Sequence, residues 1–154
     1  MKCEYRPVTG SDILELSKNA RLLDVQEVSA VTNMSMLQTL EYSVKTSSLC
    51  ASAYVDGKLN AILGVCPQSL SIINTVGVPW MIGTDLVTEN KKVFCSEYSA
   101  IIKQMLGEYS LLQNYVDARN KPAITFLKRA GFTIDKAIPF GIKQMPFHRF
   151  YKRA

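Results

Sequence analysis

The stretch from Leu111 to Phe132 constrains the fold more than any other, because it predicts a strand, a turn, a helix and the start of another strand in unbroken order. Leu111 to Val116 is a short apolar run of the kind that forms a buried strand. Asn120 is a favourable helix N-cap, and Pro122 stands in the first helical turn, where its missing N–H removes no hydrogen bond. The pattern therefore predicts a buried strand followed by a well-bounded helix.

The helix predicted after Asn120 has one apolar face and a clear end. Its apolar residues recur at helical spacing, at Ala123, Phe126, Leu127 and Ala130. Gly131 stands where a helix commonly ends in a residue with positive φ, and Phe132 begins the next strand. The stretch therefore places a short helix between two strands.

These residues resemble a motif of the GCN5-related N-acetyltransferase (GNAT) superfamily, whose fourth core helix is commonly preceded by Asn and followed by Gly-Phe. The matching residues are Asn120, Ala123, Ile124, Gly131 and Phe132. Leu127 departs from the motif, because the family often has there the Tyr that protonates the departing thiolate of coenzyme A. The resemblance implies the GNAT fold and acetyl transfer from acetyl-CoA.

Three segments also look like those of a poorly characterised group of phage-encoded GNAT members. They are residues 79–85, 114–120 and 146–150, and with the motif they cover roughly the C-terminal half of the chain. Some members of that group resemble small internal proteins of short-tailed phage particles. The resemblance therefore implies a second possibility, a catalytically inactive protein that uses the fold in a virion, with virion or host proteins as partners.

Composition bounds the class of protein. A chain of 154 residues, 47% hydrophobic and 20% charged, is typical of one globular domain, here residues 1–154. No apolar run approaches the roughly 20 residues that cross a bilayer, and residues 1–6 lack the apolar core of a signal peptide. We therefore expect a cytoplasmic protein. The cysteines form no C-x-x-C pair, so neither a zinc site nor a disulfide framework is expected.

Hydrophobic periodicity and turn signals predict the remaining elements. Strands are predicted at 2–8, 48–55, 58–65, 70–78, 80–87, 132–137 and 143–151, with a tight Asp-Gly turn at 56–57 and another turn at 139–141. Helices are predicted after 9–12, at 22–31, after a capping box of Ser35 and Gln38, and from 88–90 to 107. Together with the resemblance, this order predicts an α/β (α+β) fold: a GNAT-like, mixed, mostly antiparallel sheet of six to seven strands flanked by about four helices.

The resemblance implies that acetyl-CoA enters a gap between the fourth and fifth strands, with its pyrophosphate on backbone N–H groups at the start of the following helix. A helix N-terminus offers unpaired N–H groups and about half a unit of positive charge. The implied cofactor contacts are Leu86, Val87, Thr88, Glu89, Asn90, Lys91, Lys92, Asn120 and Phe126. The glycines of the family's phosphate loop are absent here, and the alternatives are a plain helix start with solvated lysines and, for Asn120, a cap alone.

Acyl transfer to an amine needs a base for the amine and an acid for the thiolate. Asp85, near the end of the predicted fourth strand, stands close to where the family often has a Glu base; a turn carboxylate is the alternative. Tyr115 offers a hydroxyl in place of the Tyr that the family often has at the position of Leu127. The alternative is that Tyr115 packs in the core. His148 is the one His, and an isolated His titrates near neutrality, but its place between two Phe residues also suits a structural role.

The leading hypothesis is an acetyl-CoA-dependent N-acetyltransferase that moves acetyl to an amine of a protein or small molecule by direct attack in a ternary complex. Asp117 and Arg119 are expected to form a local pair that stiffens the loop before Asn120. The formal charge of +5 does not separate cofactor phosphates from nucleic acid, but no nucleic-acid-binding module is recognised. We therefore expect acetyl-CoA and an unknown amine as partners and no metal, and nucleic-acid binding through the basic C-terminal stretch is the weaker alternative.

Overall fold

The computed structural model describes residues 2–70 and 75–154 of the chain. The strands are β1 (Cys3–Arg6), β2 (Leu49–Val55), β3 (Lys58–Leu70), β4 (Thr75–Gly83), β5 (Leu111–Asp117), β6 (Thr133–Ile134), β7 (Ile138–Phe140) and β8 (Met145–Arg153). The helices are α1 (Gly10–Asn19), α2 (Leu22–Val31), α3 (Met36–Thr46), α4 (Asp85–Glu89), α5 (Lys91–Glu108) and α6 (Lys121–Arg129). None of these helices is both long and apolar enough to cross a membrane.

One sheet connects all the strands of the described residues. Its order is β1-β2-β3-β4-β5-β8-β6, and β7 pairs with β8. Every pair is antiparallel except β4 and β5, which run parallel. The predicted mixed, mostly antiparallel sheet is confirmed, although it has eight strands and six helices in the described part of the chain rather than six to seven and about four.

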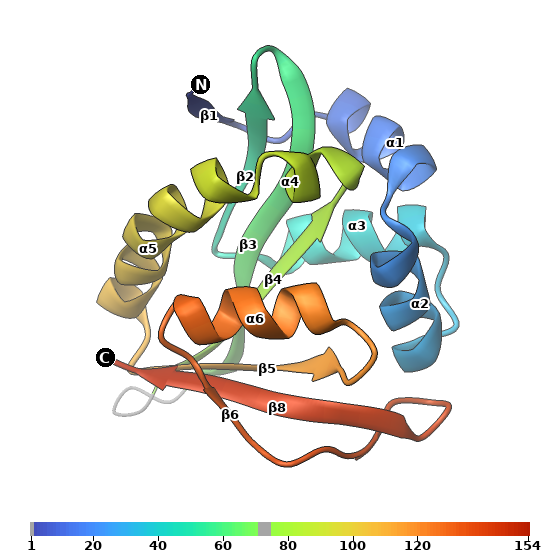
Figure 1. Ribbon diagram of the computed structural model, residues 1–154, viewed down its shortest axis with the longest axis vertical. Helices are drawn as coiled ribbons and strands as arrows, with labels where there is room; N and C mark the ends of the chain where they lie inside the picture. Colours follow the sequence, from blue (N-terminus) through green and yellow to red (C-terminus); the bar gives the residue numbers. More distant parts are fainter. Residues whose placement is uncertain (1, 71–74) are drawn as a thin grey trace.

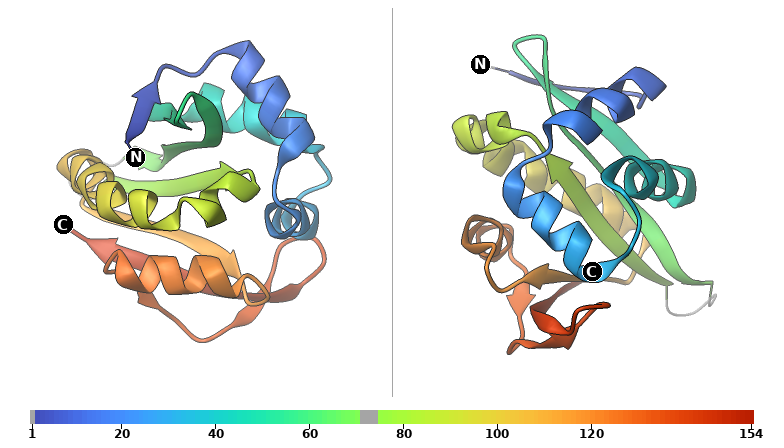
Figure 2. Two further views of the ribbon diagram at one scale, coloured as in Figure 1. Left: turned by 45° about the horizontal axis from the view of Figure 1, so that its top comes forward. Right: turned by 90° about the vertical axis from the view of Figure 1, so that its right-hand side faces the viewer.

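Helices cover both faces of this sheet (Figures 1 and 2). On one face, Leu16 of α1 and Leu40 of α3 pack with Ile62 of β3 and Ile82 of β4. On the other, α5 and α6 pack against residues of opposite parity on β3 and against β5, in a cluster that includes Leu63, Val65, Tyr98, Ile102, Met105, Leu112, Val116, Ile124 and Leu127. Because strand side chains alternate between faces, the two clusters form separate layers.

Most of the local signals form the predicted structures. Asp56 and Gly57 have positive φ angles of 51° and 76° in the β2–β3 turn, and Gly131 has a φ of 91° after α6. The side chain of Asn120 accepts a hydrogen bond from the Ala123 N–H, which caps α6. Ser35 and Gln38 form the predicted capping box of α3, so four of the helix and turn predictions are confirmed at the level of single hydrogen bonds and torsions.

The central feature of the sheet is that β4 and β5 separate soon after they begin. They pair only at Val76–Leu111 and Gly77–Leu112. The next contact between them is made by a side chain, because Asn114 Nδ2 donates to the Pro79 carbonyl oxygen at 2.8 Å. Figure 1 shows the two strands starting side by side and diverging, β4 toward α4 and β5 toward α6. The splayed strand pair implied by the resemblance is therefore present.

The fourth strand was predicted to continue to Val87, and that prediction is wrong. It ends at Gly83, because Thr84 caps a new helix: its hydroxyl accepts the Leu86 N–H at 3.2 Å. The strand also contains Pro79, whose carbonyl faces β5. Since Pro79 directs its carbonyl away from β3, its missing N–H removes no bond from the β3–β4 ladder.

The other boundary errors concern β6 and the β7–β8 turn near one edge of the sheet, and the β3–β4 connection. The strand predicted at 132–137 is limited to Thr133–Ile134, and the turn predicted at 139–141 falls at Gly141–Gln144, after the short strand β7. The second hairpin strand was predicted to end at 65, but β3 continues through Pro67 to Leu70 with an irregularity in its register. The prediction of a strand at 70–78 falls partly outside the described residues, at 71–74; Leu70 is the last residue of β3, and 75–78 belong to β4.

Replacement of Gly77 by Ala tests the junction where the two strands meet. A Cβ at Gly77 would lie 2.8 Å from the Tyr109 ring and from Val65 Cγ2, so we expect Gly77→Ala to lower the free energy of unfolding by about 1–3 kcal/mol in urea. Gly107→Ala is the matched control, because no atom lies within 4 Å of its Cβ and Ala favours the helix, by up to about 1 kcal/mol. Equal effects of the two substitutions would contradict close packing at the junction.

Candidate active site

A cleft of about 680 Å³ occupies the space between the diverging strands. Residues of β4 and β5 form its sides, α6 lies along it, and α2 lies at its open end, to the right in Figure 1. Residues from α3 line it on one face of the sheet and residues from α4 and α5 on the other. The cleft therefore passes through the sheet, as an unpaired stretch between two strands allows.

Two carboxylates of α2 hold the ends of the separated strands. Asp24 Oδ2 accepts the backbone N–H of Gly83, the last residue of β4, at 2.9 Å. Glu27 Oε1 accepts the backbone N–H of Asp117, the last residue of β5, at 2.9 Å. Because Asp24 and Glu27 are three residues apart, they lie on one face of the helix. Helix α2 therefore supplies the hydrogen-bond acceptors that the two strand ends do not supply to each other.

Asp24 is buried, and its negative charge is balanced by Arg21. The Arg21 guanidinium donates from Nε and Nη2 to the two carboxylate oxygens at 3.1 Å each, and the Arg21 N–H donates to the Gly83 carbonyl at 2.8 Å. Burial raises the pKa of Asp24, while the Arg21 charge and the Gly83 N–H act in the opposite direction. This arrangement fixes the end of β4 against the start of α2.

Glu27 is the more unusual carboxylate. Burial raises its pKa to about 7, and neighbouring negative charge on Asp24 and Asp117 adds to the effect, while its two hydrogen bonds oppose it. The second of these bonds comes from Asn120 Nδ2 at 3.2 Å. No ion pair of the described residues includes Glu27. A carboxyl group in the cleft that titrates near neutrality has the properties of a general base.

Hydrogen bonds within the loop between β5 and α6 hold its residues next to the Glu27 carboxylate. The predicted pair of Asp117 and Arg119 is confirmed, with Arg119 Nη2 2.7 Å from Asp117 Oδ2. Although burial would raise the pKa of Asp117, hydrogen bonds from the Arg119 side chain and N–H hold it below its usual value. Asn120 both caps α6 and contacts Glu27, so the loop holds an amide donor next to the unpaired carboxylate.

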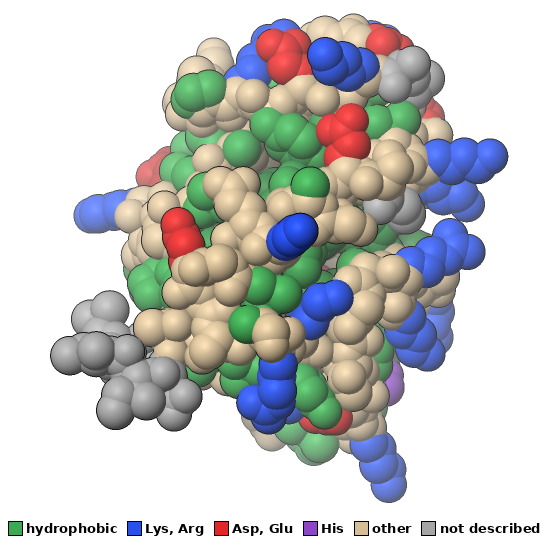
Figure 3. Space-filling view, turned by 90° about the vertical axis from the view of Figure 1, so that its left-hand side faces the viewer, with side chains coloured by type: hydrophobic (Ala, Val, Ile, Leu, Met, Phe, Trp, Pro, Cys, Tyr) green, Lys and Arg blue, Asp and Glu red, His purple; other side chains and the backbone are tan. Residues whose placement is uncertain are grey.

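The cleft opening between α5 and α6 is cationic. Its lining residues on this side are Thr88, Lys91, Pro122, Thr125, Phe126 and Arg129. Lys91 comes from the first turn of α5 and Arg129 from the last turn of α6. Figure 3 shows Lys and Arg side chains gathered along the edge of the molecule on which these helices lie, above and below a notch. Positive charge on both sides of an opening favours a ligand with phosphate groups.

The opposite end of the cleft, between α2, α3 and the β7–β8 turn, is mainly apolar. Trp80 lines it from β4, and its Nε1 donates to Ser47 Oγ at 2.8 Å. Tyr115 lines it from β5 and stacks on Phe140 with ring centroids 4.0 Å apart. The two ends of the cleft therefore differ sharply in charge.

The structure separates the residues predicted to contact the cofactor into two groups. Val87, Thr88, Lys91, Asn120 and Phe126 line the cleft. Leu86, Glu89, Asn90 and Lys92 are not among its lining residues. The segment is helical rather than extended: Val87, Thr88 and Lys91, at i, i+1 and i+4, share the face toward the cleft, and the other residues of the segment face away from it. The Asn90 side chain, for example, donates to Asn60 Oδ1 at 2.9 Å.

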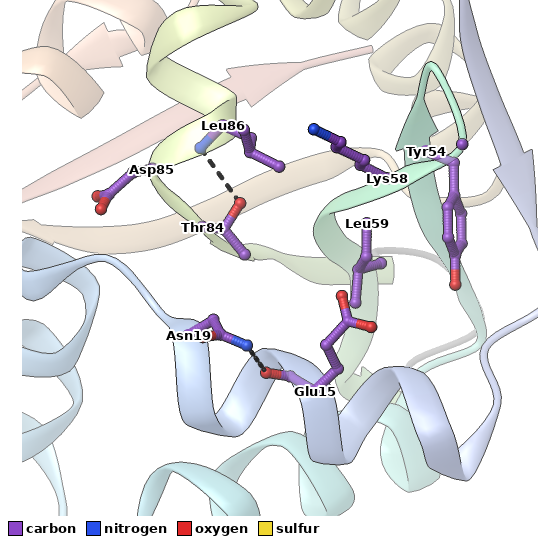
Figure 4. Close-up of a pocket in the computed structure, with 9 residues that line it drawn as sticks. Glu15, Asn19, Tyr54, Lys58, Leu59, Thr84, Asp85 and Leu86 are labelled. Atoms are coloured by element: carbon purple, nitrogen blue, oxygen red, sulfur yellow. Dashed lines mark hydrogen bonds between the residues drawn. The ribbon is translucent and has the colours of Figure 1, made fainter.

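Asp85, the predicted base, lies outside the cleft. It is the first residue of α4 and is exposed, at the edge of a smaller pocket of about 470 Å³ formed with α1 and the β2–β3 turn. Figure 4 shows this pocket, with Asp85 and Leu86 on one side and Glu15 on the other. The strand end on which the prediction placed Asp85 is two residues earlier, at Gly83, so the side chain does not reach the gap between the strands.

The other two predicted catalytic residues have different surroundings. Tyr115 lines the cleft, so its predicted role stays a prediction with suitable geometry. His148 lies on β8, where its Nδ1 is 2.8 Å from the carbonyl oxygen of Asp135, and it is not among the residues that line the cleft. This contact ties the segment after β6 to β8 and suits the structural alternative.

Sequence reasoning missed Asp24 and Glu27. Both lie in α2, which is otherwise mostly apolar, and their spacing places them on one helix face. Two acidic residues on one face of an apolar helix are a signal for a buried polar function, and it could have identified them.

Comparison with known proteins defines the fold. No family model matches the chain, and no curated protein matches it. An acetyltransferase of the GNAT family from Streptococcus pneumoniae matches with a TM-score of 0.62 at 16% identity, covering 99% of both chains. Ribosomal-protein-alanine N-acetyltransferase from Brucella melitensis gives a TM-score of 0.71 at 14% identity, covering 100% of both chains. An aminoglycoside N(6')-acetyltransferase from Legionella pneumophila gives 0.73 at 12% identity, covering 99% of this chain and 92% of that chain. The chain therefore has the GNAT fold.

The pKa of Glu27 predicts a pH-dependent stability. Because its pKa is raised on folding, the folded state binds more protons than the unfolded state between the ordinary value and about 7, so stability falls as pH rises through that range. Glu27→Gln keeps a hydrogen-bond acceptor and does not titrate. We expect its free energy of unfolding relative to the parent protein to increase by about 2–3 kcal/mol from pH 5 to pH 8. Denaturant unfolding at both pH values measures this, and a constant difference would contradict the raised pKa.

Proposed function

We propose that the protein is an N-acetyltransferase that transfers acetyl from acetyl-CoA to a primary amine in a ternary complex. The observation that carries the proposal is the cleft through the sheet, with a cationic opening at one end and Glu27 at the open end of the diverging strands. Solved structures of the same fold include a RimL protein acetyltransferase in complex with coenzyme A and AAC(6')-Ib with paromomycin and acetyl-CoA. These complexes support the choice of co-substrate.

The edge of β4 suits the pantetheine arm of acetyl-CoA. Pro79 directs its carbonyl toward β5, and Gly83 directs its N–H and carbonyl away from β3, toward α2. Because backbone groups alternate along a strand, the N–H and carbonyl of Met81 face the cleft as well. An amide-containing arm can pair with such an edge as a further strand does.

We expect the phosphates of acetyl-CoA to be bound by side chains rather than by the backbone of a glycine-rich loop. The short helix α4 stands where the family has that loop, and Lys91 and Arg129 line the opening from opposite sides. Two cations on facing helices provide charge-assisted hydrogen bonds to phosphate oxygens. Thr88 adds a hydroxyl on the same side.

Glu27 is the proposed base. In the reaction a bond forms between the amine nitrogen and the acetyl carbon, the carbon–sulfur bond breaks, and the amine loses a proton. A carboxylate with a pKa of about 7 accepts that proton efficiently near neutral pH. Glu27 replaces Asp85 in this role because it lines the cleft and Asp85 does not. Tyr115 is the proposed acid that protonates the departing thiolate, since its side chain lines the same space.

Acetyl-CoA should stabilise the protein through the cationic opening. A ligand at 100 times its Kd adds about 2.7 kcal/mol to the free energy of unfolding, which thermal unfolding detects readily. We expect Lys91→Gln and Arg129→Gln each to weaken acetyl-CoA binding about tenfold, because each removes a charged hydrogen bond. Lys92→Gln is the matched control, since the neighbouring Lys92 does not line the cleft. The alternative, an inactive GNAT-fold protein of a virion, predicts no stabilisation at millimolar acetyl-CoA.

Loss of the base should slow the reaction without affecting cofactor binding. We expect Glu27→Gln to lower kcat/KM by about 10²–10⁴-fold, the usual contribution of a general base, and to leave the Kd of acetyl-CoA unchanged. The parent protein should show kcat/KM rising with pH through an apparent pKa near 7, and the variant should lose that dependence. Asp85→Asn is the control. If Asp85→Asn abolishes activity and Glu27→Gln does not, the assignment of the base is wrong.

A further inference from the structure

The neutral end of the cleft contains a site whose chemistry points to a class of acceptor. Its lining residues, on the α3 face of the sheet, include Val31, Thr39, Ser43, Cys66, Trp80 and Phe140. Cys66 is engaged by the hydroxyls of Thr46 and Ser47 at 3.4 and 3.3 Å, so it is held within a hydroxyl cluster. These residues are uncharged, and the charged side chains that line the cleft near them are Arg21, Asp24 and Glu27 of α2 and its N-cap.

Aromatic rings stand on both sides of the gap at this end. The Trp80 ring, on β4, is held by its hydrogen bond to Ser47 and packs at the edge of the α1–α3 core. Across the gap, Tyr115 of β5 stacks on Phe140 at an interplanar angle of 14°, and Phe147 packs behind Phe140. Flat apolar walls on two sides favour a flat or branched apolar body between them.

The β7–β8 turn beside this end exposes an apolar side chain. The β7–β8 turn closes against α2, because the N–H groups of Ile142 and Lys143 donate to the carbonyls of Val31 and Ala30 at 3.4 and 3.3 Å. Ile142 in that turn is 51% exposed. Lys143 carries the one charged side chain of the turn, and its charge is positive.

The carboxylates near this end can pair with only one cationic group of an acceptor. Asp24 is bonded by both oxygens to Arg21, and Asp117 by both oxygens to Arg119. Glu27 alone of these three lacks an ion pair among the described residues. Each further ammonium group of an acceptor would have to lose its hydration without a partner, which is costly.

We propose, on the basis of the proposed function, that the acceptor is a primary amine borne on an apolar or aromatic body with no second positive charge. The amine lies beside Glu27, and the apolar body lies between Trp80 and the Tyr115–Phe140 stack. Polyamines and aminoglycosides, which carry several ammonium groups, are excluded by the same argument. The amine can belong to a free arylalkylamine or to the first residue of a peptide.

The test compares amines at fixed acetyl-CoA, with the acetylated product measured by mass spectrometry. The panel contains phenethylamine, a short peptide with N-terminal Phe, spermidine and kanamycin. We expect kcat/KM for phenethylamine or the peptide to exceed that for spermidine and kanamycin by at least about 100-fold. The better of the first two identifies the source of the amine. A preference for spermidine or kanamycin would overturn the proposal, while leaving acetyl transfer itself established.

Substitutions at two positions, Trp80 and Thr39, keep the test specific. Trp80→Leu should lower kcat/KM for the preferred aromatic amine about tenfold with no change in the KM of acetyl-CoA, and Trp80→Phe should restore most of it. Thr39→Glu adds a carboxylate to the neutral lining and should raise kcat/KM for spermidine about tenfold. Unchanged selectivity in both Trp80→Leu and Thr39→Glu would contradict the assignment of this end. If thermal unfolding shows no acetyl-CoA binding and no amine is acetylated, the proposed function fails and this inference fails with it.

Discussion

The hydrogen bonds between α2 and the ends of β4 and β5 are the interactions on which the rest of the site depends. Parallel strands ordinarily satisfy each other's backbone groups along their length, but here the pairing stops at Gly77 and Leu112. The N–H groups beyond that point need other partners, because an unpaired buried N–H is costly. Asp24 and Glu27 supply two of them and so hold the cleft at a fixed width.

The same requirement explains why a carboxylate with an unusual pKa lies in the cleft. Two carboxylates on adjacent turns of a buried helix face cannot both be ionised without compensation. Arg21 compensates Asp24, and Arg119 compensates Asp117. Glu27 receives only neutral donors, from Asp117 N–H and the Asn120 amide, and these do not offset the burial that raises its pKa. The group that spaces the strands is therefore also the group suited to accept a proton.

The sequence predicted the features that depend on neighbouring residues. The caps at Asn120 and Ser35 and the turn at Asp56-Gly57 are confirmed because each depends on torsions and hydrogen bonds within a few residues. The end of β4 was placed too late, because the local Thr84 cap of α4 was overlooked and the partners of Gly83, which are Asp24 and Arg21, are far away in the chain. Glu27 was missed for the second of these reasons, since it meets Asp117 across 90 residues of sequence. Only the folded chain brings such groups together.

The opposed chemistry of the two ends of the cleft follows from which elements reach each end. The cationic opening is formed by the first turn of α5 and the last turn of α6, two positions exposed to solvent where Lys91 and Arg129 require no partner. The other end is formed by strand faces and by α3, whose side chains also build a hydrophobic core, so Trp80 serves both the core and the lining. Charge at that end is limited to what α2 and the β5–α6 loop hold by hydrogen bonds. On the proposed function, the phosphates of acetyl-CoA would therefore lie at the cationic opening, and the neutral body of the acceptor would lie at the other end with its amine beside Glu27.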